Sequence, residues 1–240
     1  SVSISAYLLK ELSDNKINII FCDEKHNPFG ELSSYYSRYN TSKKIKEQIA
    51  WKEKNKDNLW MKIVKNKITN QALLLQKIHS DKYELILEYA DNVASGDKTN
   101  REGHSAKVYF NVLFGTSFSR NNNSDINTAL NYGYAVLLST INKEIVSNGY
   151  LTQLGIHHKN EFNEYNLTCD LMEPFRIIID NFVYFNQERI FDSDYKMDIV
   201  NIFNKTYLYG GKKYSLKDVI KMYVKKTLDS INNVEKYEDF

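Results

Sequence analysis

Two adjacent histidines and two acids lie close together between Leu154 and Asp180. From Leu167 onward the apolar residues recur at helical spacing, and Asp170 and Glu173 stand three positions apart within this pattern. Their side chains are then roughly 60° apart around the helix axis, so both can point at one spot. Carboxylates beside an imidazole indicate a hard-metal or acid/base site. Acids in the first turn of a helix are also favoured by the helix dipole, and this structural interpretation stays open.

A further acid, Glu102, comes early in another predicted helix. Thr99 to Glu102 fits a capping box, in which the glutamate only reaches back to the backbone of Thr99. However, Glu102 also shares a helical face with four apolar residues, Ala106, Tyr109, Phe110 and Leu113. An inward-pointing carboxylate needs a cation or hydrogen-bond donors, because burying a lone charge is costly. The sequence leaves both interpretations open.

The histidines His157 and His158 are consecutive, so only one of them can easily face a site if the backbone is regular. Either could instead be a core histidine with satisfied hydrogen bonds. Lys107 and Arg176 lie within about one and a half helical turns of the two glutamates. They could form simple salt bridges, but beside a metal site they would suit a phosphate group.

Helical periodicity dominates the elements that must position these residues. The chain holds only two prolines and nine glycines in 240 residues, which favours long helices. A short amphipathic helix is predicted at 2–13, then a buried strand at 17–22 and a loop at 23–36. Further helices are predicted at 42–79, 82–93, 99–114, 125–148, 167–187 and 215–231, with a turn at 210–211.

The predicted fold class is therefore mainly α. A six-residue strand needs partners to bury its faces, so residues 1–36 are expected to be the C-terminal part of a small N-terminal β-rich domain that is shortened here. The absence of an initiator methionine fits such a trimmed chain. Residues 37–240 are expected to form one large helical domain, and 42% hydrophobic residues suffice for a sizeable core.

Positive charge is concentrated in two runs, although the formal net charge is only +2. Residues 41–67 contain nine lysines and three acids, and residues 212–226 contain six lysines and one acid. Each run taken singly could be a solvated helix face. Together, with acids gathered elsewhere, they permit a basic groove that neutralises the phosphates of a long polyanion.

The cysteines and the hydropathy indicate where the protein works. Cys22 and Cys169 are isolated and lack metal-type spacing, which suits a reducing cytosolic setting. No apolar run reaches the roughly 18 residues that a membrane helix needs, so no membrane partner is expected.

Four sequence blocks together resemble a known family. They are NREGHSAKVYF at 100–110 with LFG at 113–115, ALNYGY at 129–134, LGIHH at 154–158 and CDLMEPFR at 169–176. In this order and spacing they resemble the CRISPR spacer-acquisition integrases, the universal CRISPR-associated metal-dependent DNA endonucleases, and most those of type II systems. The resemblance runs along essentially the whole chain.

The resemblance implies a three-ligand metal site, with Mg²⁺ or Mn²⁺ as the cofactor, in the helical domain, which would then be the catalytic one. Its glutamate falls on Glu102, its histidine on His158 at the end of the G-x-x-H block, and its acid on Glu173. Asp170 is then an accessory acid one turn before. One imidazole beside carboxylates favours Mn²⁺ more than an all-oxygen site would.

The implied activity is insertion of foreign DNA fragments as new CRISPR spacers by attack of a 3′-hydroxyl on a phosphodiester, with hydrolysis when water attacks instead. The implied partners are double-stranded and branched DNA, a second copy of the chain paired through the N-terminal domain, the small companion protein of the adaptation complex and, in a type II setting, its effector nuclease. The implied location is the prokaryotic cytoplasm. Candidates for orienting phosphates or DNA ends are Lys107, Asn131, Tyr134 and Arg176.

Two other function classes remain open at this stage. A non-catalytic helical scaffold would bind DNA and use the acids only as caps and salt bridges. A metallohydrolase acting on a small phosphorylated substrate would instead have a closed pocket, and its affinity would depend little on DNA length or salt. The two lysine-rich runs favour a long polyanion over this second alternative.

Overall fold

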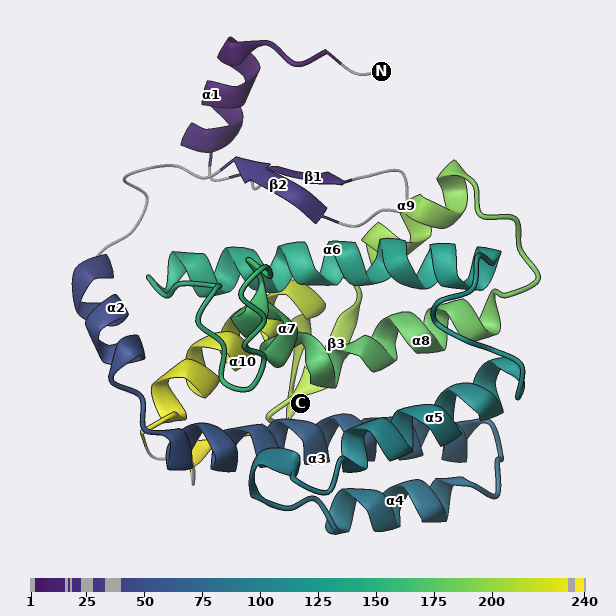
Figure 1. The fold of residues 1–240 in the computed structure, drawn as a ribbon. Coiled ribbons are helices and arrows are strands. Elements are labelled where there is room, and N and C mark those ends of the chain that lie inside the picture. Colours follow the sequence, from purple (N-terminus) through teal and green to yellow (C-terminus); the bar gives the residue numbers. More distant parts are fainter. Residues whose placement is uncertain are drawn as a thin grey trace.

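The computed structural model describes residues 3–15, 17, 19–22, 28–32, 40–232 and 236–239. Helices make up most of these residues, and Figure 1 shows them as one bundle with a small hairpin near the N-terminus. The predicted mainly α fold with a small N-terminal β element is confirmed.

The N-terminal part begins with helix α1 (Ala6–Asp14), which confirms the predicted amphipathic helix. Strand β1 (Ile19–Cys22) then pairs antiparallel with β2 (Pro28–Leu32). The expected loop at 23–36 is wrong where β2 lies, because pairing with β1 makes a strand of residues whose local signals are those of a turn. Pro28 is tolerated there as the first residue of its strand.

The expectation that the first strand is buried is also wrong. Phe21 is 37% exposed and Ile17, just before the strand, is 52% exposed. Residues 23–27 and 33–36 of the predicted loop lie outside the described residues. A two-stranded hairpin offers no second sheet or helix layer to bury both faces of a strand.

The predicted helix at 42–79 is two helices, α2 (Thr41–Ile49) and α3 (Glu53–Lys77). The chain bends between them at Lys52, which has extended backbone angles. The bend buries Trp51 against Tyr150, with ring centroids 5.6 Å apart. Tertiary burial of this indole therefore overrides a helical pattern that continues through the sequence.

Helix α3 is the central element of the core. It packs against α4 (Tyr83–Asp91), the 3₁₀ turn η1 (Ser95–Asp97), α5 (Arg101–Phe114) and the 3₁₀ turn η2 (Glu173–Phe175). Six of its apolar side chains are fully shielded from solvent: Leu59, Trp60, Ile63, Val64, Ile68 and Leu75. These residues form the buried apolar stripe of α3, whereas Ile49 on α2 is 70% exposed.

Helix α6 (Asp125–Ser147) forms the second long element, above α3 in Figure 1. It packs against four helices, α7 (Asn166–Met172), α8 (Arg176–Phe185), α9 (Ser193–Ile202) and α10 (Leu216–Ser230). The close approach of α6 to α8 requires Gly133, because a Cβ there would lie 2.4 Å from Cγ2 of Ile179. The α6 prediction is confirmed, and the helix stops before Gly149, which has a φ of +84°.

The C-terminal part adds a second hairpin. Strands β3 (Thr206–Tyr209) and β4 (Lys212–Ser215) pair around the predicted turn at Gly210 and Gly211. The strands themselves were not predicted. The basic helix expected at 215–231 is confirmed as α10. Among the described residues, no helix combines the length and the apolar character needed to cross a membrane.

Candidate active site

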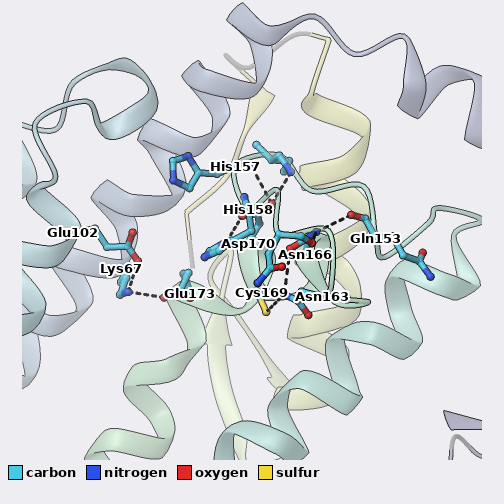
Figure 2. Close-up of polar contacts among 12 residues, drawn as sticks. Lys67, Glu102, Gln153, His157, His158, Asn163, Asn166, Cys169, Asp170 and Glu173 are labelled. Atoms are coloured by element: carbon cyan, nitrogen blue, oxygen red, sulfur yellow. Dashed lines mark hydrogen bonds and ion pairs between the residues drawn. The ribbon is translucent and has the colours of Figure 1, made fainter. Parts of the chain in front are cut away.

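Glu102 and Glu173 meet at one cation, the ammonium group of Lys67. The Nζ atom of Lys67 lies 2.6 Å from Oε1 of Glu102 and 2.5 Å from Oε2 of Glu173. The three side chains come from α5, η2 and α3, and Figure 2 shows Lys67 between the two carboxylates. All three are largely shielded, with exposed side-chain fractions of 11% for Lys67, 24% for Glu102 and 4% for Glu173.

The start of α5 leaves the Glu102 side chain free of any capping role. The predicted Thr99 cap is wrong: Asn100 is the N-cap, with a φ of +51°, and its Oδ1 accepts from the Gly103 amide at 3.2 Å. The carboxylate of Asp97 accepts from the backbone amides of Arg101 and Glu102, at 2.8 and 3.0 Å. Because these side chains satisfy the first amides of the helix, the Glu102 carboxylate can face inward.

Glu173 is held from its other side by Arg176. Pro174 interrupts the helix predicted at 167–187, so that Glu173 lies in η2 and Arg176 begins α8. Nε of Arg176 donates to Oε1 of Glu173 at 2.9 Å. The buried Oε2 faces Lys67 as an ion pair and accepts no hydrogen bond of regular geometry. Of the two Glu173 oxygens, Oε1 is therefore held by Arg176, whereas Oε2 faces Lys67.

The charges of this cluster stabilise one another. Burial alone would raise the pKa of Glu173, but the charges of Arg176 and Lys67 lower it to about 2. Burial alone would lower the pKa of Lys67, yet the charges of Glu173 and Glu102 raise it above its ordinary value. The carboxylate is therefore anionic at neutral pH, as metal coordination requires.

Asp170 holds the histidine loop. Its carboxylate is fully buried, and Oδ1 lies 2.6 Å from Nδ1 of His158. It also accepts backbone N–H bonds from Ile156, His157 and His158, at 2.5, 3.0 and 3.1 Å. A carboxylate facing Nδ1 favours the tautomer with its proton on that atom, which leaves the Nε2 lone pair for a ligand. Asp170 thus binds the histidine loop, whereas Glu173 pairs with Lys67 and Arg176.

The loop needs a glycine at Gly155. A Cβ there would lie 2.4 Å from the carbonyl oxygen of His158 and 2.8 Å from Oδ2 of Asp170. Side-chain amides brace the rest of the loop. Gln48 donates to the carbonyls of Leu151 and Leu154, at 2.8 and 2.9 Å. Nδ2 of Asn166 donates to the Gln153 and Asn160 carbonyls at 3.0 and 2.8 Å.

The two histidines have different surroundings. The ring of His157 is stacked on Trp60, with centroids 4.3 Å apart and planes 4° apart, and the residue is exposed. His158 stands edge-on to the same indole at 5.7 Å. The hydrogen bond to Asp170 raises the pKa of His158, burial opposes this, and the negative charges of Glu173 and Glu102 add to the rise.

The arrangement is not that of a closed metal cage. Within the part of the chain that the structure describes, no three His, Cys, Asp or Glu side chains are placed to hold a metal ion together. The two glutamates instead share the Lys67 ammonium. Two carboxylates and the imidazole of His158 are ligand types that suit a divalent cation. An open cavity of about 570 Å³ is lined by His158 but not by Lys67, Glu102 or Glu173.

Among the predicted DNA-contacting residues, Tyr134 lies beside Arg176. Its guanidinium lies over the ring of Tyr134 at 4.6 Å, and the Tyr134 hydroxyl donates to Asp180. Asn131 accepts from Nη2 of Arg120 at 2.6 Å. Lys107 is exposed on α5. Arg176 therefore contacts Glu173 directly, and Tyr134 is linked to Glu173 through its contact with Arg176.

A buried polar network extends behind the site. The carboxylate of Asp180 accepts from the hydroxyls of Tyr109, at 3.0 Å, and of Tyr134. Burial raises the pKa of Asp180 to about 6, although both tyrosine hydrogen bonds oppose the rise. This acid lies on α8 and links α5 and α6 at their core-facing sides.

Sequence reasoning missed three residues of this assembly, Lys67, Arg120 and Asp180. Lys67 was counted only as part of a basic run. A signal was present, because Lys67 lies four residues after Ile63 on the buried stripe of α3, where a solvated lysine is out of place. Asp180 lies three residues before the buried Val183 on the largely apolar helix α8, which is the same kind of signal.

The chain is similar in sequence to a curated relative. The chain is 38% identical to the CRISPR-associated endonuclease Cas1 of Neisseria meningitidis serogroup C (strain 8013) over 178 residues. That alignment covers 74% of this chain and 59% of the relative. The chain thus spans under two thirds of the length of this relative.

Solved structures share the fold. A Cas1 protein from Thermotoga maritima matches with a TM-score of 0.79 and 17% identity, over 97% of this chain and 84% of that one. A Cas6-RT-Cas1–Cas2 complex matches at 0.77 and 17%, over 98% of this chain and 31% of that one. A casposase bound to its integration product matches at 0.66 and 19%, over 99% and 82%.

A family model matches most of the chain. The family model described as CRISPR associated protein Cas1 matches residues 1–205, a span that includes the helices of the glutamate pair and the loop of His158. The fold, the blocks around the site and this match agree, and the chain belongs to the Cas1 family.

Proposed function

We propose that this chain is a divalent-metal-dependent DNA endonuclease and integrase that inserts foreign DNA fragments as new spacers into a CRISPR array. The observation that carries the proposal is the convergence of Glu102 and Glu173 on one cation, beside a histidine whose Nδ1 faces a buried carboxylate. Membership of the Cas1 family and the relative named as an endonuclease support it.

Glu102, Glu173 and Nε2 of His158 would hold the metal, Mg²⁺ or Mn²⁺. When bound there, the ion would polarise a phosphate and offset the charge that develops on it. The residues fit such an ion because Glu173 is kept anionic and has an oxygen with no regular hydrogen bond. Asp170 faces Nδ1 of His158, and such a carboxylate partner is usual for metal-binding histidines.

In integration, the 3′-hydroxyl of the incoming strand attacks a phosphorus atom of the target strand. A new phosphorus–oxygen bond forms, the old bond to the target 3′-oxygen breaks, and that oxygen takes up the proton that the attacking hydroxyl loses. In hydrolysis, water is the attacking group. No high-energy cofactor is needed, since the number of phosphodiesters is unchanged in the transfer.

Residues around the site would bind and orient the DNA. Arg176 fixes Glu173 and carries further N–H groups that suit a phosphate oxygen. Tyr134 supports the guanidinium of Arg176 with its ring. Asn131, through Arg120, and the exposed Lys107 supply further polar and positive groups. The lysine-rich runs at 41–67 and 212–226 would neutralise the backbone of a long duplex.

The proposal includes a division into two domains, residues 1–36 for pairing with a second copy and 37–240 for catalysis. The paired strands β1 and β2 before the helical bundle support this division. A small companion protein of the adaptation complex is a further proposed partner, and a solved relative is titled as a Cas1–Cas2 complex. We further propose that the chain forms a homodimer and works with a type II effector nuclease. Its proposed location is the prokaryotic cytoplasm.

The position of Lys67 favours one alternative, a DNA-binding scaffold in which the glutamates only form salt bridges. An assay on branched DNA with Mn²⁺, with and without a chelator, separates the two functions. We expect joined or cleaved strands that disappear with chelator. DNA binding without any metal-dependent product would establish the scaffold, and turnover of small phosphate esters alone would establish a metallohydrolase.

A further inference from the structure

Lys67 lies between the two carboxylates that are proposed to bind the metal. Its ammonium is 2.6 Å from Glu102 and 2.5 Å from Glu173, and the lysine side chain is 11% exposed. We propose that Lys67 is a built-in competitor of the divalent cation: it keeps the two glutamates together without metal and must leave them when metal binds. This inference rests on the proposed function of the site.

The two cations cannot share these oxygens. Divalent ions such as Mg²⁺ bind carboxylate oxygens at about 2.0–2.1 Å, so the ion would occupy the space that the ammonium fills. An ammonium that stayed in place would also lie within a few ångströms of a doubly charged ion, in a poorly solvated site where charge repulsion is strong. Metal binding therefore includes displacement of Lys67.

Displacement is structurally simple. The lysine side chain is a flexible four-carbon stem, and α3 can keep its position while the ammonium moves toward the accessible side of the site. Glu173 retains its second partner, Arg176, at 2.9 Å throughout. The carboxylate is therefore never left unpaired, and a released ammonium beside the site would meet the phosphates of bound DNA.

Competition has a clear consequence for affinity. A neighbouring opposite charge changes the proton affinity of a carboxylate by roughly one to three pKa units, that is, by about tenfold or more. The affinity of the same carboxylates for a divalent ion should change by a similar factor. Removing the ammonium should therefore tighten metal binding, whereas removing a salt bridge that only maintains the fold should loosen it.

The experiment measures Mn²⁺ affinity of the full chain without DNA, by calorimetry at pH 8. Lys67→Met has a side chain of similar length without charge, and Lys67→Arg keeps the charge. Lys65→Met is the matched control on the same helix, since Lys65 is 53% exposed and pairs with Asp91 at 3.0 Å. We expect Lys67→Met to bind Mn²⁺ about tenfold more tightly than the wild type. Lys65→Met and Lys67→Arg should gain no affinity.

The outcomes separate this inference from the proposed function. Wild-type binding with equal or weaker binding by Lys67→Met would overturn the role of Lys67 and leave the metal site intact. No Mn²⁺ binding by any variant would overturn the metal-dependent function itself. Mn²⁺ binding by Lys67→Met but not by the wild type would support both the metal site and the role of Lys67. If Lys67→Met is unfolded by circular dichroism, Lys67→Gln takes its place, and a larger Mn²⁺-induced rise in Tm than in the wild type replaces the calorimetric result.

Discussion

The Nδ1 atom of His158 lies 2.6 Å from Oδ1 of Asp170, a buried carboxylate that also receives three backbone N–H bonds from the same loop. One side chain therefore sets both the loop conformation and the orientation of the imidazole. Since these partners all favour an anionic acceptor, replacing the carboxylate should change the site without removing any proposed metal ligand.

Asp170→Asn should lower Mn²⁺ affinity by about 10- to 100-fold, because the amide is a poorer acceptor and no longer fixes the histidine. The buried backbone amides also lose a charged acceptor, so we expect a loss of about 1–3 kcal/mol in the free energy of unfolding. Calorimetry with Mn²⁺ and urea unfolding measure the two effects. Asp198→Asn, at an exposed pair with Arg189, is the control. Unchanged Mn²⁺ affinity would remove Asp170 from its positioning role.

Glu102→Ala, His158→Ala and Glu173→Ala should each abolish metal-dependent strand transfer on branched DNA. All three should keep their helical circular dichroism. Glu173→Ala should be the least stable, by about 3 kcal/mol, because it leaves the charges of Lys67 and Arg176 without their buried partner. Strand transfer is followed by gel electrophoresis of labelled DNA. Full activity of any one variant would exclude that residue from the ligand set.

Stability should depend on pH through Asp180. Its pKa is about 6 in the folded chain and 3.8 as the ordinary value, so the folded state holds this proton more tightly. Stability then falls as pH rises from about 4 to 6, by about 3 kcal/mol for this group. Asp180→Asn keeps an acceptor for the tyrosines and should lose this slope. Urea unfolding at several pH values measures it, and equal slopes in both proteins would contradict the prediction.

Glu173 contributes in a separate pH window with the opposite sign. Its folded pKa of about 2 lies below the ordinary value of 4.5, so its contribution is present above pH 4.5 and is lost as pH falls toward 2. The wild type should therefore unfold in strong acid partly through protonation of Glu173. Glu173→Gln should lack this acid-dependent loss. The same urea series, extended to pH 2.5, compares the variant with the wild type.

Gly155→Ala should disturb the histidine loop. The added Cβ would lie 2.4 Å from the His158 carbonyl, so backbone must move, at a cost of about 1–3 kcal/mol in unfolding free energy. Mn²⁺ affinity should fall with it. Gly30→Ala is a suitable control, since its Cβ would make only an ordinary contact at 3.8 Å with Phe21. Equal stability and affinity of Gly155→Ala and the wild type would show that the loop tolerates a side chain.

Local sequence patterns were enough to predict most of the helices around the site. The periodicity of α5, α6 and α10 predicted them nearly to their ends, although it missed the interruption at Pro174 that separates α7 from α8. These features are local, because a helix and its caps depend on residues a few positions apart. The family blocks added His158 and Glu173 as proposed ligands, whereas spacing alone could not choose between His157 and His158.

Which charged side chains pair with one another depends on the packing of distant elements. Lys67 lies 35 residues before Glu102 and pairs with it because α3 and α5 pack side by side. The strand β2 forms because β1 pairs with it, and Trp51 breaks a continuous helical pattern because it is buried against Tyr150. Asp170 turns to the histidine loop although its spacing permits other directions. Such contacts depend on how distant elements pack, and a periodic sequence pattern carries no information about that packing.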